Sequence, residues 1–224
     1  MSLGQSARAG RIFKFVSGTT EEETFHVVTV DGHESLSRPY RFEFNLASQK
    51  EEVDFQAILE NPAYLGFKQG VSLHGSDKRG VQSLRIHGII TEIEECEQQA
   101  DWIVYRAVMV PRLWRLGQTV RSRIFMGKSI IEIIEKVLKD NGFDEEDYEF
   151  RTDYREYGQR EYVVQYEESD LDFISRLMEH EGIFYFFSHA GDAEKMIVTD
   201  NPKTYETLPG DNDFQYTPIR PDTE

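Results

Sequence analysis

The chain of 224 residues lacks several features that would assign it to a class of protein at once. No stretch approaches the ~20 consecutive apolar residues that a membrane-spanning helix needs. The first ten residues contain no apolar run of the kind found in secretory signals. We therefore expect residues 1–10 to form a flexible leader, with no signal peptide. The protein is expected to be made in the cytoplasm and to be exported only through a dedicated machine.

Cysteine is almost absent, which restricts both redox and metal chemistry. Cys96 is the single cysteine, so the chain cannot form an internal disulfide or a zinc site with several thiolates. Its neighbours include Glu94, Glu95 and Glu97, whereas reactive cysteines occur in basic surroundings. We interpret Cys96 as an ordinary position on a strand or at the surface.

Motifs for metal and cofactor binding are also missing. The six histidines are scattered, and none has the His-Glu-x-x-His spacing of zinc peptidases. The one possibility for a metal site that the sequence leaves open is a site assembled from residues far apart along the chain. The run Met126-Gly127-Lys128-Ser129 resembles the end of a phosphate-binding loop, but Ser122 stands where that loop needs glycine. We predict no metal ion, no nucleotide and no other cofactor. The histidines are His26, His33, His74, His87, His180 and His189.

Catalytic residues are not apparent either. Glu167, Glu168, Asp170 and Asp172 lie together, and a glycosidase needs two carboxylates that face each other across a cleft. These four flank the start of a predicted helix, where acids stabilise the helix dipole. No Gly-x-Ser-x-Gly elbow of a serine hydrolase occurs. We predict that the chain has no catalytic residue and is not an enzyme.

Negative charge is plentiful but unevenly placed. The net charge is −16, and residues 1–140 hold 19 acidic and 18 basic side chains, whereas residues 141–224 hold 22 and 7. The acidic last third repels nucleic acid and anionic lipid. The one basic cluster, interleaved with aromatic residues, resembles a nucleic-acid patch, but we favour a contact with the acidic third or with a neighbouring subunit. Its members are Arg112, Arg115, Arg121, Arg123 and Lys128.

The first half of the chain has the pattern of a β-protein. Residues 40–46 alternate apolar and polar side chains, as a strand with one buried face does. Further strands are predicted at 11–16, 25–30, 84–94 and 102–110, with a short helix over 54–59 that Asp54 caps. Turns are predicted at Asp31-Gly32 and at residues 61–64, and a bulge or bend at Gly88. We predict a small antiparallel barrel over residues 11–112.

The second half mixes helices with strands. Ser129 and Glu132 form a capping box, and the following apolar stripe predicts a helix that ends at Asn141-Gly142. A second helix is predicted from Ser169 to Gly182, with strands at 161–166, 183–187 and 196–199. The fold class is therefore mixed α+β, with an α/β domain over residues 113–208. Residues 209–224 are predicted to be a polar tail or the start of a further domain.

Five runs of residues are distinctive. They lie at residues 36–42 (LSRPYRF), 87–91 (HGIIT), 110–114 (VPRLW), 122–125 (SRIF) and, as the longest run, 164–186. These runs resemble motifs of one family, the VgrG and Rhs-element spike proteins and the related late-control and baseplate-hub proteins of contractile phage tails. The resemblance covers about residues 25–200, and the motifs occur in the family's order.

This resemblance implies a structural role in a contractile injection machine, either a type VI secretion system or a phage tail. It implies a tube-like barrel followed by an α/β insertion domain, and a trimer that seats on a hexameric Hcp-like tube protein. Effector or tip proteins and the target membrane would meet only downstream parts of the spike. Members are held in the bacterial cytoplasm and secreted when the machine fires. The sequence stops at Glu224, so the second barrel and the needle are expected to be absent.

Two other readings stay open. The first is a cell-wall-degrading hydrolase of a tail machine that uses the acidic residues of the second half. The second is a monomeric protein-binding module built on exposed barrel edges.

Overall fold

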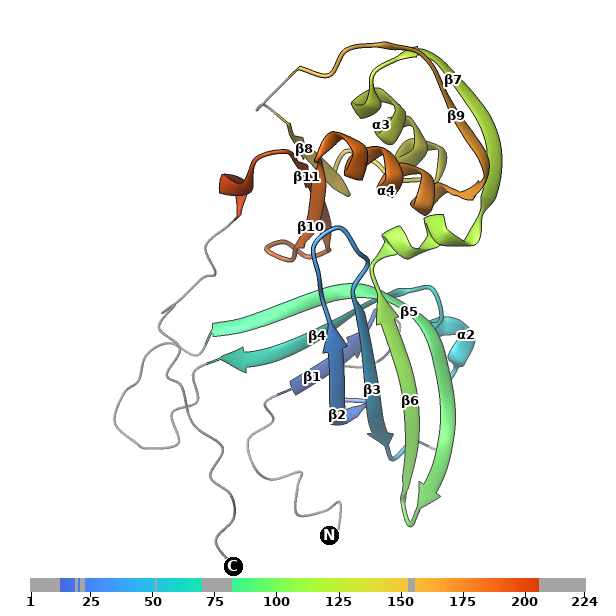
Figure 1. Ribbon diagram of the computed structural model, residues 1–224. Helices are drawn as coiled ribbons and strands as arrows, with labels where there is room; N and C mark the ends of the chain where they lie inside the picture. Colours follow the sequence, from blue (N-terminus) through green and yellow to red (C-terminus); the bar gives the residue numbers. More distant parts are fainter. Residues whose placement is uncertain are drawn as a thin grey trace, which may run out of the picture.

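A computed structural model describes residues 13–205 except for 19, 21–22, 51, 70–81 and 153–155. The predicted leader 1–10 and the predicted tail 209–224 lie outside these residues. Figure 1 shows two packed units, which we call the sheet unit (residues 13–110) and the α/β unit (residues 112–205).

The sheet unit is a curled, six-stranded antiparallel sheet with the strand order β1-β4-β5-β6-β3-β2. Its strands are β1 (Phe13–Ser17), β2 (His26–His33), β3 (Arg41–Ser48), β4 (Pro62–Gln69), β5 (Gln82–Gln99) and β6 (Trp102–Val110), and α2 (Phe55–Ile58) follows β3. The edge strands β1 and β2 pair only with β4 and β3, so the described residues form a half-barrel and not the closed barrel that the sequence predicted.

The concave face of this sheet encloses an aromatic core. Phe15, Phe44 and Tyr105 are almost fully buried there, which agrees with the alternation of apolar residues along their strands. Phe15 on β1 contacts Phe25, next to β2, with 5.8 Å between ring centroids. Packing of this kind across the open side keeps the sheet curled without a ladder of hydrogen bonds between its edges.

Strand β5 joins the two parts of the sheet. Its first half, from Gln82 to Ile89, pairs with β4, and its second half, from Ile89 to Gln99, pairs with β6. Within the named strands Ile89 has a partner on both sides, namely Pro62 and Val110, and the next residue, Ile90, pairs with Met109 and forms an isolated bridge with Leu59. The register shifts in the second half, between Ile90 and Glu92 and again between Glu95 and Glu97, bend the strand.

Two predicted turns are wrong, for different physical reasons. Gly32 lies inside β2 opposite Phe42, and a Cβ atom built on Gly32 would meet the Phe42 ring at 2.2 Å. Glycine is therefore needed here for a close approach and not for a turn. Residues 61–64 lead directly into β4, whose first residue is Pro62. Proline is tolerated at the first position of a strand. Asn61 closes the short helix instead, through bonds from its side-chain amide to the carbonyls of Ala57 and Leu59.

The α/β unit places two helices between two small sheets (Figure 1). Its helices are α3 (Ile130–Asp140) and α4 (Asp170–Glu181), with short 3₁₀ segments η1 (Arg112–Gln118) and η2 (Pro202–Thr204). Strands β7 (Val120–Lys128) and β9 (Arg160–Ser169) form an antiparallel ribbon. Strands β10 (Phe184–Ser188), β11 (Lys195–Thr199) and β8 (Tyr148–Arg151) form a mixed sheet, in which β11 and β8 are parallel.

The ends of both helices confirm the sequence prediction. Ser129 and Glu132 make the full capping box of α3, and Asn141 is its C-cap. Ser169 caps α4 by accepting a hydrogen bond from the Asp172 N–H, and Gly182 ends it with φ of 70°. The sequence analysis missed β4, η1, β7 and β8.

Gly88 lies in a regular part of β5, where the backbone of β6 approaches it closely. A Cβ atom there would be 2.6 Å from the Val110 carbonyl oxygen and 2.9 Å from the Met109 side chain. We expect Gly88→Ala to lower the free energy of unfolding by about 2 kcal/mol, because backbone has to shift. Urea denaturation measures this, with Gly66→Ala in β4 as the matched control.

In the control, the added Cβ meets its nearest neighbours at 3.7 Å, an ordinary contact. Gly66→Ala should therefore leave stability unchanged or raise it by about 0.5 kcal/mol. Equal losses in the two variants would show that general sensitivity of the strands, and not the approach to Val110, explains the glycine at position 88.

Candidate protein-contact surfaces

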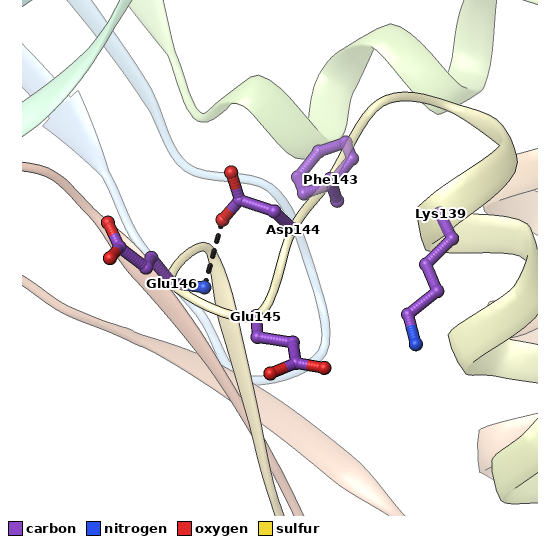
Figure 2. Close-up of a pocket in the computed structure, with 5 residues that line it drawn as sticks. All are labelled: Lys139, Phe143, Asp144, Glu145 and Glu146. Carbon is purple, nitrogen blue, oxygen red and sulfur yellow. Dashed lines mark hydrogen bonds between the residues drawn. The ribbon is translucent and has the colours of Figure 1, made fainter.

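One hollow at the surface of the α/β unit is lined by acids but does not form a catalytic pair. It measures about 510 Å³ and is lined by Lys139, Phe143, Asp144, Glu145 and Glu146 (Figure 2). Asp144 accepts a hydrogen bond from the Glu146 N–H at 2.9 Å, so it shapes its own loop. The Lys139 ammonium pairs with Glu135 at 2.9 Å. Asp144 and Lys139 therefore have structural partners.

The four predicted acids around residue 170 do not face one another across a cleft. Asp172 and Ser169 exchange hydrogen bonds at the helix N-terminus, and Glu168 pairs with Arg176 at 2.6 Å. Glu167 is exposed at a backbone position with φ of 47°. Within the described parts of the chain, no three His, Cys, Asp or Glu side chains are placed to hold a metal ion.

Asp170 is a fully buried carboxylate at the first turn of α4. Arg123 donates to it at 2.6 Å, the Arg121 guanidinium lies 3.3 Å away, and Gln165 and Asn141 donate at 2.9 and 2.8 Å. A buried charge is tolerated only when it is paired and hydrogen-bonded in this way. The network ties both strands of the ribbon to α3 and α4.

The basic cluster therefore turns largely inward, as the sequence predicted. Arg121 and Arg123 hold Asp170, and Arg112 pairs with Asp147, all within the acidic third of the chain. Arg115 departs from the prediction, because it donates to the Glu60 carbonyl of the sheet unit at 2.9 Å. The surface that resembled a nucleic-acid patch in the sequence is thus occupied by internal contacts.

Asp170→Asn tests this network. The change keeps the shape of the side chain but leaves two guanidinium groups next to a neutral amide. We expect the free energy of unfolding to fall by about 3 kcal/mol, the usual effect of breaking a buried ion pair. Chemical denaturation at neutral pH measures it, and Glu179→Gln on the exposed face of the same helix should change stability by less than about 0.5 kcal/mol. A loss below 1 kcal/mol in Asp170→Asn would contradict a structural role for the charge.

The ribbon β7–β9 carries an exposed apolar face. Ile124 and Val164 form one cross-strand pair on it, and Met126 and Tyr162 form the next. Apolar faces of this extent usually mark a contact with another protein. The large exposed side chains of the ribbon are Val120, Ile124, Met126, Tyr162, Val164 and Tyr166, from 40% to 70% exposed.

The two units meet at a seam formed by β10 and its following turn against the sheet unit. The Ser37 N–H donates to the Tyr185 carbonyl at 2.9 Å, and the Tyr40 ring packs on Phe187 with centroids 5.0 Å apart. Near the connection between the units, the Arg112 N–H donates to the Glu194 carboxylate at 2.9 Å. Burial raises the pKa of Glu194, although this hydrogen bond opposes the shift.

Two histidines meet at this seam, although 102 positions separate them in the sequence. The His87 N–H donates to His189 Nδ1 at 3.1 Å, and Tyr40 donates its hydroxyl to the His87 carbonyl. Burial, reinforced by His87, lowers the pKa of His189 to about 4. Burial and the nearby Arg85 also lower the pKa of His87, against the opposing effect of Asp192.

The remaining sequence candidates lie apart from one another. Cys96 is exposed on β5, in agreement with the surface position that was predicted. His180 is exposed at the end of α4 and lies 3.2 Å from Glu181. None of the helices in the described ranges is both long and apolar enough to span a bilayer.

A half-barrel with open edges, packed on an α/β unit with an exposed apolar ribbon, is typical of a component of a larger protein assembly. Comparison with known proteins identifies the assembly. The family model of the phage tail baseplate hub (GPD) matches residues 33–224. The chain therefore belongs to the baseplate hub family, and it is homologous to the type VI secretion spike proteins called VgrG.

Two relatives from Pseudomonas aeruginosa show the extent of this similarity. The type VI secretion system spike protein VgrG4b is 33% identical over 182 residues, which is 81% of this chain and 21% of that protein. VgrG1b is 31% identical over 215 residues, 93% of this chain and 27% of that protein. The chain thus spans about a quarter of the length of these relatives.

Solved structures share the fold. The E. coli c3393 protein, a type VI secretion component with structural similarity to the T4 phage tail proteins gp27 and gp5, matches with a TM-score of 0.74 and 25% identity. That match covers 87% of this chain and 51% of the other. A chain of the Francisella PdpA–VgrG complex matches with a TM-score of 0.52 and 14% identity, over 84% of this chain and 31% of that one, which shows the fold alone.

Proposed function

We propose that this chain is the N-terminal hub portion of a VgrG-type spike, a structural part of a contractile injection machine and not an enzyme. The observation that carries the proposal is the curled six-stranded sheet whose outer strands β1 and β2 each pair with one strand within the described residues, in a chain that the baseplate hub model matches from residue 33 onward. Free edges and curvature are what a ring of barrels needs, because neighbouring subunits continue the wall.

In this proposal, residues 11–112 form the tube-like barrel domain and residues 113–208 the insertion domain on its outside. Residues 209–224 then lead toward the rest of the spike. The hub is a homotrimer in the longer protein and seats on a hexameric Hcp-like tube. Effector or tip proteins attach to downstream parts, which alone touch the target membrane. The protein waits in the bacterial cytoplasm and leaves through the machine.

Charge supports a contact with protein rather than nucleic acid. The net charge of −16 opposes binding to phosphate backbones, and Arg112, Arg121 and Arg123 are engaged within the chain. Glu43, Glu92 and Glu94 surround Arg106 on the outer face of the sheet. This network of ion pairs makes the outer face of the sheet polar and rigid. Such a face suits a contact with the surface of a tube protein that does not bury it in an apolar core.

Association measurements test the proposal in two parts. Light scattering gives the mass of the 26.1 kDa chain and of the product of its whole reading frame. We expect a trimer from the longer product. A monomer at high concentration from both would overturn the hub and favour a monomeric binding module.

Binding to the tube is tested separately by titrating the hexameric tube protein encoded in the same genome, followed by interferometry. We expect saturable binding that needs the folded sheet unit. The Gly88→Ala variant, warmed above its unfolding midpoint, serves as the control for nonspecific adhesion. Absence of binding by a trimeric product would contradict the tube-seating role. Release of sugar or peptide from purified peptidoglycan would instead support the hydrolase.

A further inference from the structure

The seam between the two units contains an arrangement that only neutral histidine satisfies. His189 Nδ1 accepts the backbone N–H of His87, so its proton must sit on Nε2. His189 Nε2 and His87 Nδ1 are buried and have no hydrogen-bond partner among the described residues. Protonation of His189 would place hydrogen on Nδ1, where the His87 N–H already points. The hydrogen bond would be lost, and a charge would be enclosed among aromatic rings.

The surroundings of His189 offer little to compensate such a charge. The rings of Tyr40 and His87 lie 5.5 and 5.9 Å from it, centroid to centroid. Arg85 stacks on Tyr64, next to His87, and adds positive charge. The acids of the seam are Asp192, which pairs loosely with Arg85 at 3.9 Å, Glu194, which bonds the Arg112 N–H, and Glu34 in the β2–β3 loop.

Two of these acids, Glu34 and Glu194, have the opposite effect on the closed seam as the pH falls. Burial raises the pKa of Glu34 and of Glu194, so both take up a proton before an ordinary carboxyl does as the pH falls. They are then neutral when His189 becomes charged, and they cannot balance it. Their protonation removes the cost of burying a charged carboxylate and so stabilises the closed seam, whereas protonation of the histidines opens it.

We propose that this seam is an acid-sensitive latch, in which His189 holds the two units together at neutral pH and releases them when it is protonated. In the open form, His189 meets water and binds a proton with its ordinary pKa of 6.5, whereas in the closed form that pKa is about 4. The open form therefore binds more protons throughout this interval. Through His189 alone, lowering the pH from 7 to 4.5 raises the ratio of open to closed molecules about 60-fold.

The remaining contacts make the latch a local device and not a general acid unfolding. The connection between the units runs through residues 110–112, and Arg115 still donates to Glu60 when His189 is charged. The main cores of the two units are separate clusters that Phe187 contacts on both sides, and next to the connection Trp114 packs on Ile89, Val108 and Val110 of the sheet unit. Opening the seam thus moves the β10–β11 hairpin away from Tyr40 while each core stays packed.

Fluorescence energy transfer in the whole chain tests the latch. One dye is attached to Cys96 on the sheet unit and the other at Glu145→Cys on the α/β unit, since both positions are exposed. We expect a narrow distance distribution at pH 7 that broadens by pH 4.5. Circular dichroism over the same range should show that both units remain folded.

Two further variants isolate His189. In His189→Asn, the side-chain oxygen replaces Nδ1 as the acceptor and cannot titrate, so the distribution should stay narrow down to pH 4.5. The matched control His180→Asn removes an exposed histidine and should broaden as the parent does. A parent distribution that stays unchanged to pH 4.5, or broadening in His189→Asn equal to that of the parent, would overturn the proposal.

A second measurement covers the case in which His189→Asn fails to fold. The ring protons of His189, observed by NMR in the unmodified chain, should titrate together with the amide of Ser37 on the other side of the seam. Titration of His189 without any change at Ser37 would show that its charge is not coupled to the seam.

Discussion

The burial of Asp170 is the interaction on which the α/β unit depends. A carboxylate without access to water needs cations and donors around it, and the chain supplies them from β7, from β9 and from the end of α3. The inner side of the ribbon is therefore partly polar at Arg123 and Gln165, where a core-facing strand is normally apolar. Its outer side holds Ile124, Met126 and Tyr162. The same network that ties the ribbon to the helices thus leaves its apolar residues facing outward.

This inversion explains why the sequence did not predict β7. Strand prediction relies on apolar side chains at alternate positions, with the apolar set inside. In residues 120–128, Phe125 points inward and Ile124 and Met126 point outward, so both sets contain apolar residues. The helices were predicted accurately because their caps are local: Ser129, Ser169 and Gly182 act on backbone groups within a few positions. Five of the six strands of the sheet unit were predicted because the alternation of apolar side chains is also local, whereas β4 was missed and Gly32 was misread because its constraint comes from Phe42 on another strand.

The surfaces show the limit of sequence analysis in another way. The inward orientation of the basic cluster followed from the uneven distribution of charge. The pairing of His87 with His189 had no local signal, because scattered histidines become a feature only when the two units pack together. The family was recognised from short ordered motifs, and one of these includes His87 without revealing its partner. Distant contacts of this kind are set by the packing of whole units, which no window of sequence contains.

Strand β5 pairs with β4 along one half and with β6 along the other, so it connects two smaller sheets. Hydrogen bonds fix the geometry within each small sheet, but the angle between them depends on the bend of a single strand just beyond Ile89, where the register shifts begin. Bending of β5 at this point changes the radius of the half-barrel, and the hydrogen-bonded strand pairs on either side are kept. The curvature of the sheet unit is therefore adjustable at a single strand.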